Sequence, residues 1–385
     1  MDLLFLAMIA AVSGLFLFNG GDDPEEAETG EDTSGGEDPI ITSFGDLLLS
    51  QTEDGNATIY GGAGDDVYHS ERGVGDAIDD YVSENGLTLN ALHAGDGNDS
   101  IYSTDHNALS ESDDGGSIFG GAGDDTIYSQ FSDVDGGTGN DSIRLDLNYA
   151  SAAAHGGDGD DHLSVVSYGN GHEVGPTAHG FALHGDAGND TLSGFAGDFF
   201  GGDGNDSILV NGTFSGTSNA DGGAGDDTIS VDRMVHYYQL HDDSPGLRDF
   251  RAGDFEITGG EGADRFEINA DIRYVRAGQE IAVLSTITDF NPDEDVLSFS
   301  YETGDINPYV FDHDRTETTN HFVSYGGFTE AADGSYTDVM ISVTGEDAQD
   351  GTPITQEFAI RLAGISGLDP ASVTLDAVNG EIMIG

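Results

Sequence analysis

The chain has 385 residues, of which 59 are glycine and 8 are proline, and its hydrophobic fraction of 36% is low for a globular core. Aspartate and glutamate total 74 against 10 basic residues, all of them arginine, so the formal net charge is −64. Self-repulsion on this scale opposes compaction without counter-ions, which makes nucleic acid a poor partner and cations the natural one. Cysteine is absent, so disulfide bonds cannot cross-link the fold.

The first 20 residues contain an apolar stretch from Leu3 to Phe18. Asp2 stands where a secretory signal usually has basic residues, so an atypical export signal and a short N-terminal membrane anchor both remain open. A buried helix packed on the main domain is the third alternative. Residues 21–40 are acidic and contain no basic side chain, which predicts a disordered linker.

Residues 41–267 contain a nine-residue repeat. Such internal repetition indicates a stack of identical structural units. The nine copies are GGAGDDVYH at Gly61, AGDGNDSIY at Ala94, GGAGDDTIY at Gly120, GGTGNDSIR at Gly136, GGDGDDHLS at Gly156, GDAGNDTLS at Gly185, GGDGNDSIL at Gly201, GGAGDDTIS at Gly222 and GGEGADRFE at Gly259.

Each repeat is flanked by a pattern of period two, which predicts strand, turn and strand. Of the two residues before the motif, the first is apolar in every copy and is expected to point inward. After the turn, one apolar residue per copy is expected to point inward again. These residues are Val67, Ile101, Ile127, Ile143, Leu163, Leu192, Ile208, Ile229 and Phe266. Stacked coils would then form two parallel sheets around a narrow apolar interior.

The turns are suited to calcium, a hard cation that takes six to eight oxygen ligands. The sixth position is aspartate in every copy. Glycines at the second and fourth positions permit backbone conformations that a β-carbon would block, and these turn carbonyl groups inward. One turn cannot fill the shell, so each ion should join two coils. The predicted carboxylate ligands are Asp66, Asp99, Asp125, Asp141, Asp161, Asp190, Asp206, Asp227 and Asp264. The associated glycines are Gly62, Gly64, Gly121, Gly123, Gly137, Gly139, Gly157, Gly159, Gly202, Gly204, Gly223 and Gly225.

Two irregularities qualify this pattern. Asp186 replaces the second glycine in the copy at Gly185, which predicts a weaker site. The copies start 16 to 37 residues apart. Intervals of 16 to 21 residues fit one full coil with the motif on one side only. This spacing argues against a second row of calcium sites on the other side. Longer intervals imply either looped-out half-coils or a coil whose motif has decayed.

The repeats resemble the RTX, or haemolysin-type, calcium-binding repeat G-G-x-G-x-D-x-U-x, in which U is a large apolar residue. The resemblance covers about Gly61 to Glu267 and implies an all-β fold, a right-handed parallel β-roll that forms a calcium-bound solenoid. The stretch GGEGADRFEI, followed by STITDFNPDEDVLSFSY, resembles the closing region of serralysin-type β-rolls, which implies a C-terminal β cap over residues 268–385. Resemblance to the RTX family implies export by a type I system that reads a C-terminal secretion signal. By the same resemblance, Asp289 and Asp295 are expected to bind metal. Thr337 to Gly345 and Glu357 to Leu362 alternate as the two strands of a hairpin would.

No catalytic signature is present. His172 and Glu173 begin a zinc-protease motif, but Pro176 occupies the place of its second histidine. The nucleophile elbow and the P-loop are both absent. His93, His155 and His184 share the position just before the turn. A metal-binding ladder is one interpretation of them, and outward strand-end residues are the simpler one.

The sequence therefore predicts a non-enzymatic, extracellular calcium-binding protein that folds when it binds several Ca²⁺ ions and has a structural or adhesive role. A cell-surface or matrix polysaccharide is the expected partner besides calcium, with tethering to the cell surface left open. The alternative is a secreted hydrolase or polysaccharide-modifying enzyme carrying the repeats as a tail.

Overall fold

The computed structural model describes residues 40–44, 47–51, 56–70, 84–103, 116–129, 133–146, 153–166, 181–194, 197–211, 218–235, 255–272, 281–302, 318–347, 352–369, 373–376 and 381–384. The expected signal or anchor (1–20) and nearly all of the expected linker (21–40) lie outside these ranges. Among the described residues, no helix is long and apolar enough to cross a membrane.

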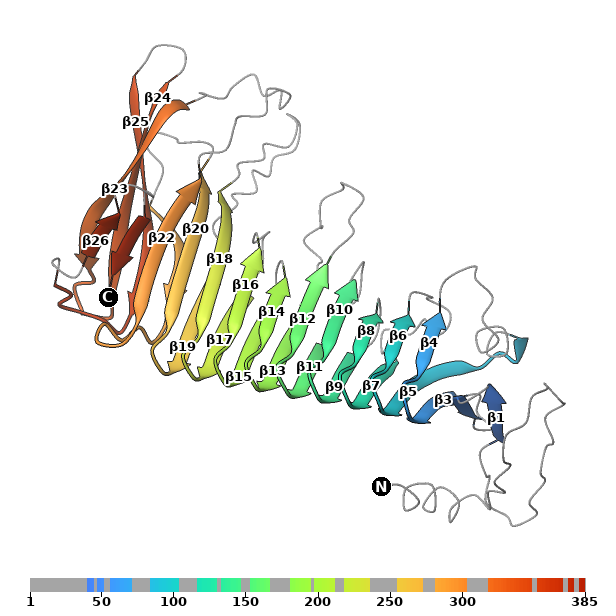
Figure 1. The fold of residues 1–385 in the computed structure, drawn as a ribbon. Coiled ribbons are helices and arrows are strands. Elements are labelled where there is room, and N and C mark those ends of the chain that lie inside the picture. Colours follow the sequence, from blue (N-terminus) through green and yellow to red (C-terminus); the bar gives the residue numbers. More distant parts are fainter. Residues whose placement is uncertain are drawn as a thin grey trace.

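Two long sheets, one before and one after each turn, form the molecule (Figure 1). The first sheet contains, in spatial order, β1 (Ile40–Phe44), β2 (Leu47–Gln51), β3 (Asn56–Ala63), β5 (Thr88–Asp96), β7 (Ser117–Ala122), β9 (Asp133–Thr138), β11 (Ala153–Asp158), β13 (Ala182–Ala187), β15 (Asp198–Asp203), β17 (Ser218–Ala224), β19 (Phe255–Glu261), β21 (Ala282–Ile287), β25 (Pro353–Ala363), β24 (Tyr336–Asp347) and β23 (Thr318–Glu330).

The second sheet contains β26 (Val373–Asp376), β27 (Glu381–Ile384), β22 (Val296–Glu302), β20 (Arg265–Ile272), β18 (Thr228–Val235), β16 (Ser207–Asn211), β14 (Thr191–Gly194), β12 (His162–Val166), β10 (Ser142–Asp146), β8 (Thr126–Ser129), β6 (Ser100–Ser103) and β4 (Val67–Ser70). Pairing is parallel from β3 to β21 in the first sheet and from β4 to β22 in the second. The fold is thus the predicted parallel β-roll.

The core is a narrow apolar strip, as the period-two pattern predicts. The inward residues before the turns are all at most 2% exposed: Ile59, Leu92, Ile118, Val134, Ala154, Leu183, Phe199, Ala220 and Ile257. After the turn, eight of the nine predicted inward residues are buried as well. The prediction for the first copy, that Val67 points inward, is wrong. Val67 is 69% exposed and Tyr68 is 3% exposed, because Tyr68, at the eighth position, aligns with Ile101 of the next coil.

Every motif pairs directly with the next one, whatever the length of the connection between them. The second-position residues lie opposite one another along the stack, including Gly62 with Gly95 across 33 residues and Gly223 with Gly260 across 37. No decayed coil therefore lies between two motifs. In the described residues the glycine turns form a single row.

Both ends of the roll are closed by antiparallel strands. At the N-terminal end, β1 and β2 pair antiparallel with each other and with β3. At the C-terminal end, β21 and β22 form one more parallel coil beyond residue 267. β25 then pairs parallel with β21, and β24 and β23 follow it antiparallel, so these strands extend the first sheet beyond this coil (Figure 1). The predicted hairpin is confirmed, since Thr337 lies opposite Leu362 and Ser342 opposite Glu357.

Candidate calcium sites

The sixth-position aspartates form a buried row inside the turns. All of them from Asp99 to Asp264 are at most 3% exposed, whereas Asp66, in the first coil, is half-buried. In each coil from Asp99 onward, the Oδ1 atom accepts a hydrogen bond from the backbone N–H of the sixth-position aspartate in the preceding coil. An example is Asp141 N–H to Asp161 Oδ1 at 2.7 Å. One carboxylate oxygen per coil therefore joins neighbouring turns.

The other carboxylate oxygen has no such partner. Oδ2 is fully buried and accepts no hydrogen bond in seven consecutive coils, at Asp99, Asp125, Asp141, Asp161, Asp190, Asp206 and Asp227. A buried polar atom without a partner costs free energy, so a row of seven is unusual for a native fold. Oxygens of this kind are suited to a cation, which would supply the partner that they lack.

The first glycine of the motif opens the space in front of this oxygen. A β-carbon added at Gly120 would lie 2.3 Å from Oδ2 of Asp125 and 2.5 Å from the carbonyl oxygen of Gly136 in the next coil. The same convergence of a carboxylate and a carbonyl recurs at Gly136, Gly156, Gly185, Gly201 and Gly222. A glycine leaves this space free, so the turn keeps an oxygen-lined cradle between two coils; the second copy has the smallest side chain, Ala94, in this place. The sequence analysis did not identify this role, although the glycine stands at the first position in eight of the nine copies.

The second- and fourth-position glycines have the expected left-handed backbone. Their φ values lie between +105° and +150°, where L side chains are strained. A β-carbon at Gly137 would lie 2.1 Å from the carbonyl oxygen of Gly121. The carbonyl groups at these positions thus point along the stack toward the same glycine of the next coil. That they bind metal remains a prediction.

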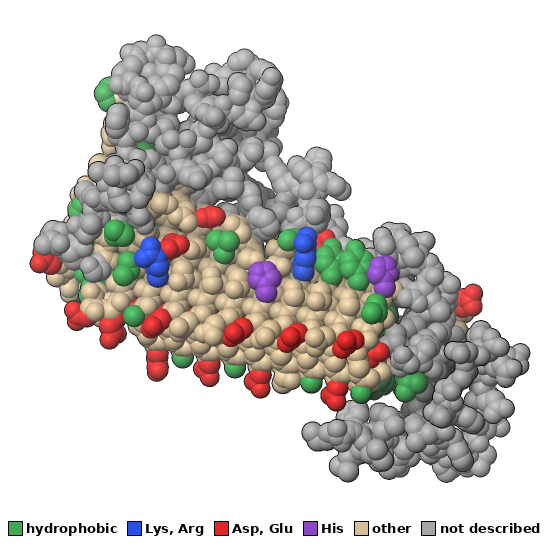
Figure 2. Space-filling model, viewed as in Figure 1, with side chains coloured by type: hydrophobic (Ala, Val, Ile, Leu, Met, Phe, Trp, Pro, Cys, Tyr) green, Lys and Arg blue, Asp and Glu red, His purple; other side chains and the backbone are tan. Residues whose placement is uncertain are grey.

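The fifth-position side chains form a second, outer ladder. An oxygen of Asp65 accepts the N–H of Asn98, and the pattern continues to Asp226, which accepts the N–H of Ala263. This explains why the last copy can have alanine there, since no tenth motif follows it. Exposed acidic side chains line the same edge of the roll (Figure 2).

Asp289 and Asp295 lie in the turn of the last coil. Oδ1 of Asp295 accepts the N–H of Asp264, so Asp295 occupies the place of a tenth sixth-position aspartate. Its Oδ2 accepts the N–H of Asn291. The carboxylate of Asp289 accepts the N–H groups of Gly259 and Gly260. All four oxygens already have partners, which is typical of a cap on the turn row, and metal binding by these two residues stays a prediction.

Burial raises the pKa values of the sixth-position aspartates. Loss of hydration, augmented by neighbouring like charges, raises the pKa of Asp125 to about 6 and those of Asp141, Asp190 and Asp227 to about 7. Burial also raises the pKa values of Asp99, Asp161, Asp206 and Asp264. The backbone hydrogen bond to each carboxylate acts in the opposite direction and is the smaller effect. The row therefore resists ionisation unless a cation replaces the lost water.

These residues fit Ca²⁺. The donor set is all oxygen, it combines carboxylate and carbonyl groups, and it is shared between adjacent coils. Sixth-position carboxylates with first-position carbonyls would hold the ions, which would supply the positive charge that the buried row lacks.

The fold and the turns define a class, the parallel β-rolls built on repeated acidic glycine turns. Within it, the family model that matches this chain is the RTX calcium-binding nonapeptide repeat, over residues 51–75, 90–107, 113–131, 182–208 and 214–233. The chain therefore contains RTX calcium-binding repeats, and calcium is their expected ligand. The copies at Gly136, Gly156 and Gly259 fall outside the matched residues but share their register. Neither a curated protein nor a solved structure matches the chain.

Proposed function

We propose that this protein is an extracellular calcium-binding β-roll that folds when several Ca²⁺ ions bind, and that its role is structural or adhesive rather than enzymatic. The observation that carries the proposal is the row of seven buried Oδ2 atoms without hydrogen-bond partners. Ions that bind only the folded state stabilise it by mass action, so they couple binding to folding.

The net negative charge of the chain supports an extracellular location. In a cytoplasm with little free calcium, a net charge of −64 favours the extended chain. Extracellular calcium modules typically bind with dissociation constants of about 10⁻⁴–10⁻³ M, which would switch folding on after export. RTX calcium-binding repeats are typical of secreted proteins. Export by a type I system, tethering to the cell surface and a polysaccharide partner belong to the same proposal.

Circular dichroism and small-angle scattering of the full chain test coupled folding. In millimolar Ca²⁺ we expect strong β signal and an elongated rod, and in EGTA at neutral pH an expanded chain with little β signal. Mg²⁺ is the control, because it demands near-octahedral geometry and loses its water reluctantly. Equal β content in EGTA and in Ca²⁺ would refute the proposal.

The non-enzymatic part has its own test. We expect no turnover of peptides, lipids or polysaccharides such as alginate by the calcium-loaded protein. Turnover that a single substitution outside the repeats abolishes would instead establish the hydrolase alternative.

A further inference from the structure

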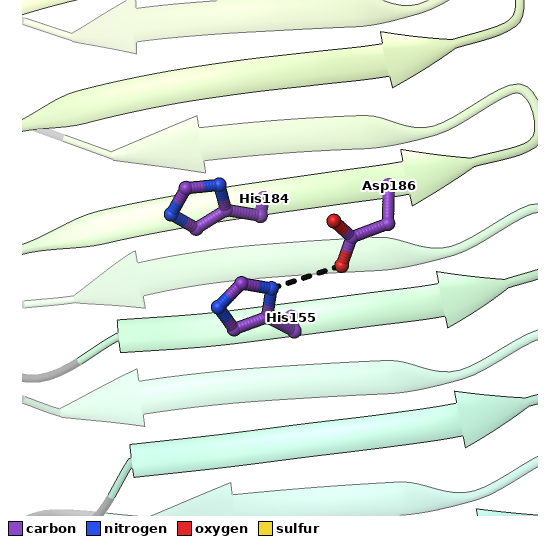
Figure 3. Close-up of side chains that lie close together, drawn as sticks. All are labelled: His155, His184 and Asp186. Carbon is purple, nitrogen blue, oxygen red and sulfur yellow. Dashed lines mark hydrogen bonds and ion pairs between the residues drawn. The ribbon is translucent and has the colours of Figure 1, made fainter.

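Two histidines and one aspartate meet on the outer face of the first sheet (Figure 3). His155 on β11 lies directly opposite His184 on the neighbouring strand β13, and Asp186 follows two residues along β13. One ligand atom from each residue lies within 4.8 Å of the other two. This cluster faces away from the core and is separate from the row of turn aspartates.

The three side chains are already aligned with one another. The imidazole rings are stacked, with centroids 4.3 Å apart and planes 3° from parallel. Nδ1 of His155 is 3.0 Å from Oδ2 of Asp186. Both side chains of this pair are accessible, at 45% and 42% exposure, so an ion could reach them from solvent.

Asp186 is exceptional within the repeat. All other copies have glycine at the second position, and Asp186 is the one non-glycine residue with positive φ, +72°, in the described parts of the chain. A residue with a β-carbon is strained in this conformation, and such strain concentrates at functional sites. The carboxylate of Asp186 points toward His155 on the neighbouring strand. The departure from the motif therefore occurs where a carboxylate would complete a ligand set with two histidines.

We propose that His155, His184 and Asp186 bind one divalent transition-metal ion of the Zn²⁺ class. Imidazole nitrogen and carboxylate oxygen suit Zn²⁺, Cu²⁺ and Ni²⁺, whereas Ca²⁺ takes oxygen ligands. Zn²⁺ binds nitrogen at about 2.0–2.1 Å in a tetrahedral arrangement, so small rotations of the two rings would bring the three ligands onto one ion, with water in the fourth position. The ion would join coils whose motifs lie 29 residues apart.

His93 provides a matched comparison. It stands at the same position before its turn and is stacked between Tyr60 and Phe119, with centroids 5.3 Å and 4.5 Å away. Its second-position residue is Gly95, so it has neither a histidine neighbour nor a carboxylate like that of Asp186. His93 should bind no metal.

Calorimetric titration of the full chain with Zn²⁺, in saturating Ca²⁺ to occupy the turn row, tests the site. We expect one Zn²⁺ per chain. H184A, H155A and D186G should each weaken its binding at least tenfold, while H93A leaves it unchanged. D186G restores the glycine of the repeat and so should fold. Electron paramagnetic resonance with Cu²⁺ as the probe should show nitrogen coordination in the wild type and lose it in the H155A/H184A double variant.

Three results would overturn the proposal: unchanged Zn²⁺ affinity in the double variant, equal weakening in H93A, or a Cu²⁺ spectrum without nitrogen coordination. Any of them would mean that His155, His184 and Asp186 do not form the metal site and that Asp186 merely hydrogen-bonds His155. Circular dichroism of every variant in Ca²⁺ verifies the fold. Calcium-dependent folding and nitrogen coordination are separate readouts, so either idea can fail alone.

Discussion

The seven sixth-position aspartates from Asp99 to Asp227 divide two tasks between their two carboxylate oxygens. Oδ1 joins the turn to the backbone of the preceding coil, as at Asp161, which accepts the N–H of Asp141. Oδ2 faces the cradle at the first glycine and accepts no hydrogen bond. An asparagine in this place could keep the first contact, but its amide nitrogen cannot bind a cation.

Asp161→Asn should therefore change stability in opposite directions with and without calcium. In saturating Ca²⁺ we expect a loss of about 1–3 kcal/mol, the usual cost of leaving a buried partner unmatched, together with a lower ion count in native mass spectrometry. In EGTA we expect a gain in β content by circular dichroism, because burial raises the pKa of Asp161 and the substitution removes that buried charge. Asp158→Asn, at the exposed third position of the same turn, should leave the ion count unchanged. A loss of stability in both conditions would contradict the division of tasks.

At the scale of the element, the turn depends on glycine at three positions for two different reasons. The second and fourth need left-handed backbone, whereas the first has ordinary φ and needs empty space. A β-carbon at Gly136 would lie 2.3 Å from Oδ2 of Asp141 and 2.6 Å from the carbonyl oxygen of Gly156. Those two oxygens belong to adjacent coils, so a methyl group here would push the coils apart.

Gly136→Ala should destabilise the calcium-loaded roll by roughly 1–3 kcal/mol, the usual cost of overpacking. It should also weaken calcium binding, because the cradle is displaced. Thr138→Ala, an exposed change in the same turn, is the control. Urea unfolding and calcium titration measure the two effects. Unaltered calcium affinity with lowered stability would place the ions elsewhere than between the sixth and first positions.

The elements of the roll were predictable because each coil repeats one local pattern. Alternation of apolar residues located both strands, and the fixed phase of glycine and aspartate located the turn. The error at Val67 arose at the first copy, where the seventh and eighth residues are both apolar, so hydrophobicity alone could not decide which one points inward. The pairing of Tyr68 with Ile101 decides it.

Features that depend on contacts between distant coils were not predictable. The space in front of Oδ2, the outer ladder of fifth-position side chains and the meeting of His155 with Asp186 all join residues that are 16 to 37 positions apart. The register that brings these residues together is set by the stacking of coils rather than by local sequence. The antiparallel pairing of β1 and β2 with β3 is likewise a tertiary feature without a motif.

At the scale of the whole molecule, the roll stacks acidic groups in its interior, and the proposed function requires a cation or protons to neutralise them. The sixth-position carboxylates recur once per coil, at the strand spacing of about 4.8 Å. Their pKa values in the metal-free fold are raised to about 6 at Asp125 and about 7 at Asp141, Asp190 and Asp227. In the unfolded chain the same groups titrate near 3.8. Protons and calcium ions therefore compete for one row of oxygens.

This competition predicts opposite pH dependences for the two states. Between about pH 4 and pH 7 the metal-free fold holds protons that the unfolded chain has released, so its stability falls as the pH rises through this window. In EGTA, circular dichroism should show more β signal, and a thermal unfolding transition, at about pH 5, and little β signal at about pH 8. In Ca²⁺ the stabilisation over EGTA should be larger at about pH 8, because at about pH 5 protons displace ions from the carboxylates.

Surface carboxylates also titrate toward acid pH and would produce part of the trend in EGTA by reducing repulsion. About 1 M KCl separates the two contributions, because it shortens the Debye length to about 3 Å and screens exposed charges while leaving buried groups largely unaffected. If the buried row causes the effect, the trend in EGTA persists in KCl and is smaller in Asp161→Asn. A trend that vanishes in KCl would assign the acid stabilisation to the surface and would leave the turn aspartates ionised at neutral pH.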